Sequence, residues 1–256
     1  MLLNYRLKSG ALLDATRISD GKLVGLKRVR KPIHPLEAEI CQLFSSEPLA
    51  SHPDNHCVPL YEVLDPPSDP DTIILVMPFL RKYDSPQLQT IGEVVEFFRQ
   101  AFKGMQFIHK HCVAHRYAPL QSLILKAPRP SDRDGHRLNI MYDATTLYPD
   151  GHHPHPIYNY RKPDFTGRAR HYTRTEYPPK YYWIDFGLST RHDPESTSPP
   201  AETRIFGGDK SVPEFQPEAY KDSYNPFPTD VYYYVGNLIK TDFFDVSAAI
   251  HVLSTH

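Results

Sequence analysis

The chain of 256 residues has little cysteine, few glycines and no excess of charge of either sign. Its three cysteines (Cys41, Cys57 and Cys112) lie far apart and form no Cys-x-x-Cys pair, which argues against a disulfide framework and a cysteine zinc site. The 29 Lys and Arg residues nearly balance the 30 Asp and Glu residues, which argues against a polybasic nucleic-acid binder and an acidic tail. We therefore expect no nucleic-acid partner.

Long apolar runs are also missing. No stretch approaches the roughly 18 apolar residues that would span a bilayer. Arg6 and Lys8 interrupt the beginning of the sequence before the apolar core of a signal peptide can form. We therefore expect reduced cysteines, no membrane partner and a location in the cytoplasm or nucleus.

Proline and tyrosine are abundant, with 26 and 17 residues respectively. So many prolines predict numerous loops and interrupted elements, because proline donates no backbone hydrogen bond and fixes φ. They do not predict disorder, since an aromatic fraction of 12% is sufficient to build a core.

The first 80 residues are predicted to alternate strand, helix, strand and strand. Residues 12–18 and 22–29 are rich in β-formers and flank Asp20-Gly21, a dipeptide typical of hairpin turns. The run 34–44 has Pro35 near its start and its apolar residues on one face, which indicates a helix. Two more strand-like runs cover 57–64 and 72–80.

The later part is predicted to be more helical. Residues 90–109 carry apolar side chains at steps of three and four, which predicts a long helix with these residues buried: Ile91, Val94, Val95, Phe98, Phe102, Met105 and Ile108. Thr90 and Glu93 form a capping-box pattern at its start. The run 180–188 reads as a buried strand, and 229–240 as a second core helix with Thr229 at its cap.

Four short signals occur in a fixed order along these elements. Lys27 ends the sequence Val-Gly-Leu-Lys within the strand-like run 22–29, and Glu37 or Glu39 follows on the short helix. His115-Arg116 comes directly after the long helix, and Asp185-Phe186-Gly187 follows the buried strand. In this order the sequence resembles a eukaryotic protein kinase, and the order is more specific than any one motif.

Further matches extend the resemblance over nearly the whole chain. Ser211-Val-Pro-Glu214 is similar to the element that closes a kinase activation segment, and Asp230 to the aspartate of kinase helix F. The runs 208–216 and 225–239 resemble a kinase-like group common in fungal genomes. The resemblance implies an α+β, two-lobed fold with a small β-rich lobe at 1–80. It implies a helical lobe at 81–256 that ends after helix F.

The resemblance also implies roles for individual residues, with ATP and Mg²⁺ as cofactors. Lys27 would contact the α- and β-phosphates while paired with Glu37. Glu37 is preferred over Glu39 because Ile40, Cys41 and Phe44 then follow it at kinase-like spacing. Asp185 would bind Mg²⁺. At the hinge, Met77 would be the gatekeeper, and the Pro78 carbonyl and Leu80 amide would meet adenine.

The catalytic loop departs from the family pattern. Tyr117 stands after His115-Arg116, where the family has aspartate, but Asp134 and Asn139 have the spacing of the family's base and second Mg²⁺ ligand. Removing 117–133 would join Arg116 to Asp134 and restore an intact loop. The segment is either a retained intron or a real insertion.

The sequence also lacks a Gly-x-Gly-x-x-Gly loop before Lys27 and offers Gly10 alone. The leading expectation is an ATP-dependent protein kinase that acts on a protein hydroxyl, with Asp134 as the base. The protein substrate is not specified by the sequence. The alternative is a catalytically inactive kinase-like binding or scaffold module.

Overall fold

The computed structural model describes residues 12–116, 139–155, 157–203, 212–215 and 223–236. Within these ranges the chain mixes three α-helices with small antiparallel sheets, which is compatible with the expected α+β class. It divides into two compact units: 1–110 with 140–187, and 111–139 with 188–256. The division into lobes at residue 80 stays a prediction. Each unit is described below by itself.

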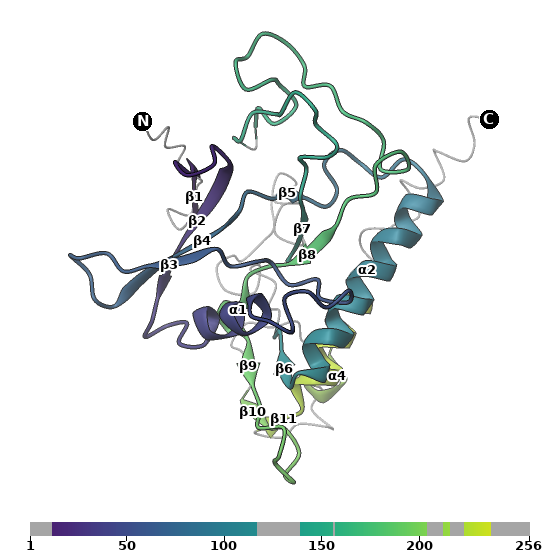
Figure 1. Ribbon diagram of the computed structural model, residues 1–256. Coiled ribbons are helices and arrows are strands. Elements are labelled where there is room, and N and C mark those ends of the chain that lie inside the picture. Colours follow the sequence, from purple (N-terminus) through teal and green to yellow (C-terminus); the bar gives the residue numbers. More distant parts are fainter. Residues whose placement is uncertain (1–11, 117–138, 156, 204–211, 216–222, 237–256) are drawn as a thin grey trace, which may run out of the picture. The chain divides into compact units, whose positions relative to one another are not determined.

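The first unit contains a four-stranded antiparallel sheet (Figure 1). Its strands, in spatial order, are β1 (Leu12–Thr16), β2 (Leu23–Arg30), β4 (Thr72–Pro78) and β3 (Glu62–Leu64). The predicted hairpin joins β1 to β2, and Gly21 turns the chain with a φ of 70°. Such a left-handed conformation is readily adopted by glycine, which is why the Asp-Gly pair signals this turn.

The expected strand at 57–64 is shorter than predicted, because only Glu62–Leu64 joins the sheet. Pro59 interrupts the run and has no amide hydrogen to donate. Before it, the Val58 amide donates to the Trp183 carbonyl at 2.9 Å, and Cys57 forms an isolated parallel bridge with Trp183. The beginning of the run therefore pairs with a segment far along the chain.

Helix α1 (Glu37–Ser45) follows the sheet's second strand, as the sequence predicts. Ile40, Cys41 and Phe44 are buried on its inner face, in agreement with the apolar spacing. The Phe44 ring contacts those of Phe107 and Phe186, with centroids 5.9 and 6.0 Å apart. These contacts anchor α1 in the core of the first unit.

Helix α2 (Ile91–Lys110) has the predicted length, but the predicted buried face is partly wrong. Ile91 and Val95 are 79% and 59% exposed, and Phe102 is also exposed. The prediction is confirmed for Met105 and Ile108, which are buried. The other buried residues of the helix are Glu93, Phe97, Gln100, Ala101, Gly104 and Phe107. The polar residues face inward because they form hydrogen bonds to the segment 175–183. Gly104 faces inward because the Trp183 ring packs directly against it.

The start of α2 matches only half of the predicted capping box. The Thr90 Oγ1 accepts from the Glu93 amide at 3.1 Å. The Glu93 carboxylate turns instead to the Gln89 amide at 2.7 Å and to the Thr175 amide at 3.1 Å. Glu93 therefore both caps the helix and ties it to a distant loop.

A second sheet in the first unit is formed by β5 (Arg81–Lys82), β7 (Ile140–Tyr142) and β8 (Tyr181–Trp183). The connection from β7 to β8 is long and is anchored by Arg174, which is 4% exposed. Its guanidinium donates to the Tyr181 hydroxyl at 2.8 Å and to the Pro86 carbonyl at 2.7 Å, and lies over the Tyr142 ring. A buried cation is tolerated because carbonyls and rings surround it.

The described residues of the second unit form two short two-stranded sheets and three helical segments. Its elements are β6 (Val113–Ala114) with β9 (Thr190–Arg191), β10 (Glu202–Thr203) with β11 (Ser223–Tyr224), the 3₁₀ turn Pro213–Phe215, α4 (Pro226–Val231) and the π-helix Tyr232–Gly236. The predicted cap at Thr229 is wrong. Asn225 caps α4, and its Oδ1 accepts from the Phe227 amide at 3.1 Å. Pro226 can follow it directly, because the first helical position needs no amide hydrogen.

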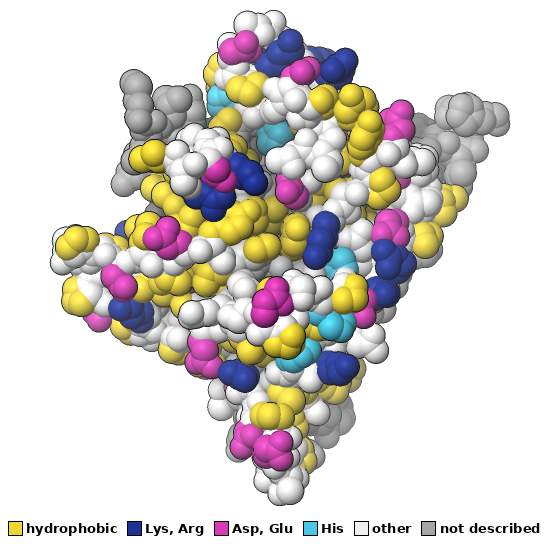
Figure 2. All heavy atoms as spheres, in the orientation of Figure 1, with side chains coloured by type: hydrophobic (Ala, Val, Ile, Leu, Met, Phe, Trp, Pro, Cys, Tyr) yellow, Lys and Arg dark blue, Asp and Glu magenta, His cyan; other side chains and the backbone are white. Residues whose placement is uncertain are grey.

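On the face drawn in Figure 2, acidic and basic side chains are interspersed, as the balanced composition indicates. Among the described helices, none has the length and apolarity needed to cross a membrane.

Candidate functional site

Lys27 lies near the middle of β2, opposite Leu75 of β4. Its Nζ forms ion pairs with two carboxylates, one from the next helix and one from a segment far along the chain. One is Glu37 of α1, and the other is Asp185, whose Oδ1 is 2.6 Å away. All three residues belong to the first unit. We call Lys27, Glu37 and Asp185 the charge triad.

Glu37 begins α1, and its position brings its side chain back toward the sheet. The carboxylate is 2% exposed, whereas Glu39, the alternative weighed from the sequence, is exposed. The two differ because Glu37 shares the buried face with Ile40 and Phe44, three and seven residues later. The apolar spacing therefore distinguishes the two glutamates correctly.

Asp185 emerges two residues after β8 in a strained backbone conformation. Its φ is 63°, a left-handed value that is uncommon outside glycine. The following residue, Phe186, is fully buried against Phe44, whereas the Asp185 side chain is 51% exposed. Such strain persists only where the surrounding contacts enforce it, and it clusters at functional sites.

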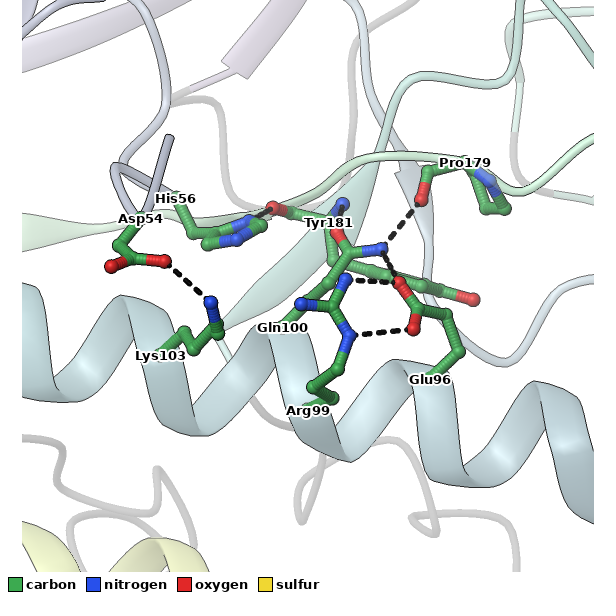
Figure 3. A network of polar contacts seen from close by, with 8 residues as sticks. All are labelled: Asp54, His56, Glu96, Arg99, Gln100, Lys103, Pro179 and Tyr181. Carbon is green, nitrogen blue, oxygen red and sulfur yellow. Dashed lines mark hydrogen bonds and ion pairs between the residues drawn. The ribbon is translucent and has the colours of Figure 1, made fainter. Parts of the chain in front are cut away.

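The strand that leads to Asp185 is fixed by a polar network with α2 (Figure 3). Gln100 donates from Nε2 to the Pro179 carbonyl at 3.0 Å, and its Oε1 accepts from the Tyr181 amide at 2.9 Å. The His56 Nδ1 lies 2.9 Å from the Tyr181 carbonyl. The buried Gln100 side chain thus both donates to and accepts from the backbone at the start of β8, which attaches this strand to α2.

Trp183 continues this attachment. Its indole Nε1 donates to the Ala101 carbonyl at 3.0 Å, and its amide donates to the His56 carbonyl at 2.6 Å. The ring lies so close to Gly104 that a β-carbon there would be 2.6 Å from the indole. Two residues before Asp185, the backbone therefore has little freedom to move.

A surface hollow of about 450 Å³ lies over the same network. Two ion pairs line it, Lys103 with Asp54 at 2.8 Å and Arg99 with Glu96 at 2.6 Å (Figure 3). The charges of these two pairs neutralise each other, and Lys180 also lines the hollow. Its residues act structurally, by joining α2 to β8.

The electrostatics of the charge triad favour a charged lysine. Burial disfavours the ammonium, but the carboxylates of Asp185 and Glu37 more than offset this, so the pKa of Lys27 is raised. Burial also raises the pKa of Glu37, against the opposing effect of Lys27. The triad thus presents a fixed positive charge beside a half-exposed carboxylate.

The three predicted hinge residues lie at or just after the end of β4. Met77 pairs with Gly25, so it shares a sheet face with Lys27, because side chains alternate along a strand. Pro78 pairs with Val24, and Leu80 is buried shortly beyond. The register therefore places the predicted gatekeeper on the same sheet face as the triad's lysine.

The predicted His115-Arg116 pair lies in the second unit, where Asp230 of α4 holds its backbone. Asp230 is fully buried, and its two oxygens accept from the His115 and Arg116 amides, both at 2.7 Å. The His115 Nδ1 lies 2.9 Å from the Tyr234 hydroxyl. The two bonds to the Asp230 carboxylate are charge-assisted, and such bonds are among the stronger hydrogen bonds in proteins.

Arg116 has a left-handed backbone, with a φ of 56°. Its guanidinium forms an ion pair with Glu202 at 3.1 Å and donates to the Thr203 carbonyl at 3.0 Å. Arg116 and Asp185 are two of the four non-glycine residues reported with positive φ in the described ranges. No sequence motif marks Glu202, because it is a lone glutamate in a loop-rich region.

The remaining predicted residues are only partly visible. Asn139 is half-buried and directly precedes β7. Asp134, the segment 117–133 and Gly10 lie outside the described residues. The described part of the chain contains no cluster of three His, Cys, Asp or Glu side chains that would hold a metal unaided.

Mg²⁺ does not require such a cluster. It is usually bound through one or two carboxylates together with substrate phosphates and water. The half-exposed carboxylate of Asp185 beside Lys27 fits that coordination.

Comparison with models of known protein families gives no match, and no curated protein matches the chain significantly in sequence.

Proposed function

We propose that this protein binds ATP with Mg²⁺ and transfers the γ-phosphoryl group to a protein hydroxyl, within a two-lobed kinase-like fold. One observation carries the proposal: Lys27 contacts both Glu37 and Asp185. These residues come from three separate elements, namely β2, the start of α1 and the segment after β8.

The chemistry of phosphoryl transfer explains why this arrangement matters. The triphosphate carries several negative charges and must be neutralised and held in line with the accepting hydroxyl. A lysine fixed by a buried glutamate supplies a cation at a defined position. An exposed aspartate beside it supplies an oxygen ligand for Mg²⁺, whose role when bound is to neutralise the phosphates. The triad provides both groups.

In this proposal Lys27 positions the phosphates, and Glu37 positions Lys27. Asp185 and Asn139 hold Mg²⁺, and Asp134 accepts the proton of the attacking hydroxyl. Met77, the Pro78 carbonyl and the Leu80 amide contact adenine. The protein substrate supplies the hydroxyl.

The second unit offers independent support. A buried carboxylate at Asp230 orders the two residues that precede the catalytic loop in the resemblance. A strained backbone is costly and persists only where its surroundings enforce it, so the positive φ at Arg116, whose amide donates to Asp230, supports a functional position.

Thermal unfolding of the full chain with ATP and Mg²⁺ tests binding. A ligand at a hundredfold excess over its dissociation constant stabilises the folded state by about 2.7 kcal/mol. No stabilisation at millimolar ATP and Mg²⁺ would contradict the proposal. The Lys27→Met variant is the control, and it should show little or no stabilisation.

Transfer of the γ-phosphoryl group to a protein mixture tests catalysis, with the full chain compared with a chain that lacks 117–133. Activity in either form supports the enzyme. Nucleotide binding without transfer in both forms would favour the alternative, an inactive kinase-like binding module. Sequencing of the transcript across this junction decides whether the segment is an intron or an insertion.

A further inference from the structure

The turn between β2 and α1 carries a histidine that the proposed function does not use. The His34 Nδ1 lies 2.8 Å from the carbonyl oxygen of Gly187, the third residue of the Asp185-Phe186-Gly187 motif. A carbonyl oxygen can only accept, so Nδ1 must carry the hydrogen. Both the Nδ1–H neutral tautomer and the imidazolium meet this requirement.

The backbone of His34 is fixed, so the imidazole is held in place. Its amide donates to the Arg30 carbonyl at 2.9 Å, and the Ile33 amide donates to the same oxygen at 3.0 Å. The Lys31 amide donates to the Asp71 carbonyl at 2.8 Å. The turn is therefore attached to the sheet that carries Lys27.

Gly187 lies where the groups of the charge triad meet the imidazole. A β-carbon at Gly187 would be 3.0 Å from the His34 Nδ1, 3.1 Å from the Glu37 Oε2 and 3.3 Å from the Asp185 Oδ1. The Glu37 Oε2 is buried with no hydrogen-bond partner among the described residues. A small shift of residue 187 would therefore disturb both carboxylates.

The motif is thus held at each of its three residues. Asp185 binds Lys27, Phe186 is buried against Phe44, and the Gly187 carbonyl accepts from His34. The strained φ of Asp185 requires this kind of support, since a strained backbone relaxes when its contacts are removed.

We propose that His34 is a positioning residue that holds the 185–187 turn so that the Asp185 carboxylate stays beside Lys27, ready to bind Mg²⁺. The effect on Mg²⁺ and nucleotide rests on the proposed function. The effect on the turn itself rests on the geometry alone.

The test compares three variants with the wild type. His34→Leu removes the donor and keeps an apolar side chain of moderate size. His34→Asn restores a donor, because the amide nitrogen of asparagine reaches about where Nδ1 lies. His171→Leu is the matched control, since the exposed His171 bonds the carbonyl of its own neighbour, Tyr172, and not a carbonyl of the 185–187 turn.

The first readout is the gain in ATP affinity that Mg²⁺ produces, measured by calorimetry with and without the metal. His34→Leu should reduce this gain about fivefold, the factor for one net hydrogen bond. Affinity for metal-free ATP should change little. His34→Asn and His171→Leu should behave like the wild type. An unchanged gain in His34→Leu would overturn the proposal. An equal loss in His34→Leu and His34→Asn would also overturn it, because it would show that the effect comes from packing and not from the hydrogen-bond donor.

The second readout needs no ligand and is hydrogen exchange of the amides at 185–188. These amides should exchange about fivefold faster in His34→Leu, and at the wild-type rate in His34→Asn and His171→Leu. Equal exchange in all four proteins would overturn the role of His34. If the wild type binds no nucleotide but the exchange results are as expected, the proposed function fails and the positioning role stands.

Discussion

Replacement of Lys27 with methionine would remove the cation from the charge triad and leave two carboxylates behind. Asp185 is half exposed, so water can solvate its charge once the lysine is gone. Glu37 is 2% exposed and cannot be hydrated in this way. A buried carboxyl without a cation takes up a proton instead.

The cost of that proton sets the size of the effect. In the unfolded chain a glutamate has a pKa of about 4.3, so keeping Glu37 neutral at pH 7 costs up to about 3.7 kcal/mol. Since its folded pKa is raised, this loss grows as the pH rises above about 4.3. At pH 5 it should be only about 1 kcal/mol.

Denaturant unfolding at pH 5 and pH 7 measures this difference. The fluorescence of Trp183, the single tryptophan of the chain, reports on the first unit, where it is buried. A second variant, Lys27→Met with Glu37→Gln, has no buried carboxyl left in the triad to protonate, so its stability loss should change little over this range. Equal losses for Lys27→Met at both pH values would refute the reasoning about Glu37.

Three other predictions concern the parts that support the site. Gly104→Ala should destabilise the first unit by about 1–3 kcal/mol, because the added β-carbon would overlap Trp183. Gly92→Ala, on the same helix, is the control. Its β-carbon would be 3.7 Å from its nearest neighbour, so it should stabilise the unit by up to about 1 kcal/mol. The fluorescence midpoint measures both, and a harmless Gly104→Ala would contradict the packing of α2 on β8. Asp230→Asn should cost about 1–3 kcal/mol, seen as faster hydrogen exchange of the two amides that the carboxylate accepts; unchanged exchange would argue against that anchor. Burial lowers the pKa of His152 to about 4. As the pH falls from 6.5 toward 4, the unfolded chain binds a proton at this histidine that the folded protein does not, so the free energy of unfolding falls by up to about 3 kcal/mol. His152→Asn should flatten this part of the pH profile, and an unchanged profile would count against the burial of His152.

Local signals in the sequence predicted the elements that depend on local physics. The Asp20-Gly21 turn, the apolar spacing of α1 and the β-rich run of β4 each describe an element whose neighbours in sequence are also its main determinants. The spacing on α1 even separated Glu37 from Glu39.

The buried face of α2 could not be predicted in the same way. Hydrophobicity places Ile91 and Val95 inside, but the structure places Gln100 and Gly104 there. Gln100 is inside because it bonds Pro179 and Tyr181, and Gly104 because Trp183 needs its space. These partners come from some 80 positions later in the chain, and periodicity contains no information about them.

The candidate site divides along the same line. Lys27, Glu37 and Asp185 were found because their order and spacing match a known pattern, and side-chain chemistry explains their meeting. The contact between His34 and the Gly187 carbonyl was not found, because it joins a turn to a backbone oxygen and leaves no residue pattern. Glu202 could not be predicted either, because a lone glutamate belongs to no residue pattern.

The central claim is that Lys27 lies against the phosphates of bound ATP. An acyl phosphate of ATP, which transfers its acyl group to a nearby amine, tests this directly when the labelled peptides are identified by mass spectrometry. The account predicts acylation of Lys27 that excess ATP with Mg²⁺ suppresses, with exposed lysines such as Lys103 unaffected by ATP. Acylation of Lys27 that ATP does not suppress, or ATP-protected labelling at another lysine alone, would contradict it.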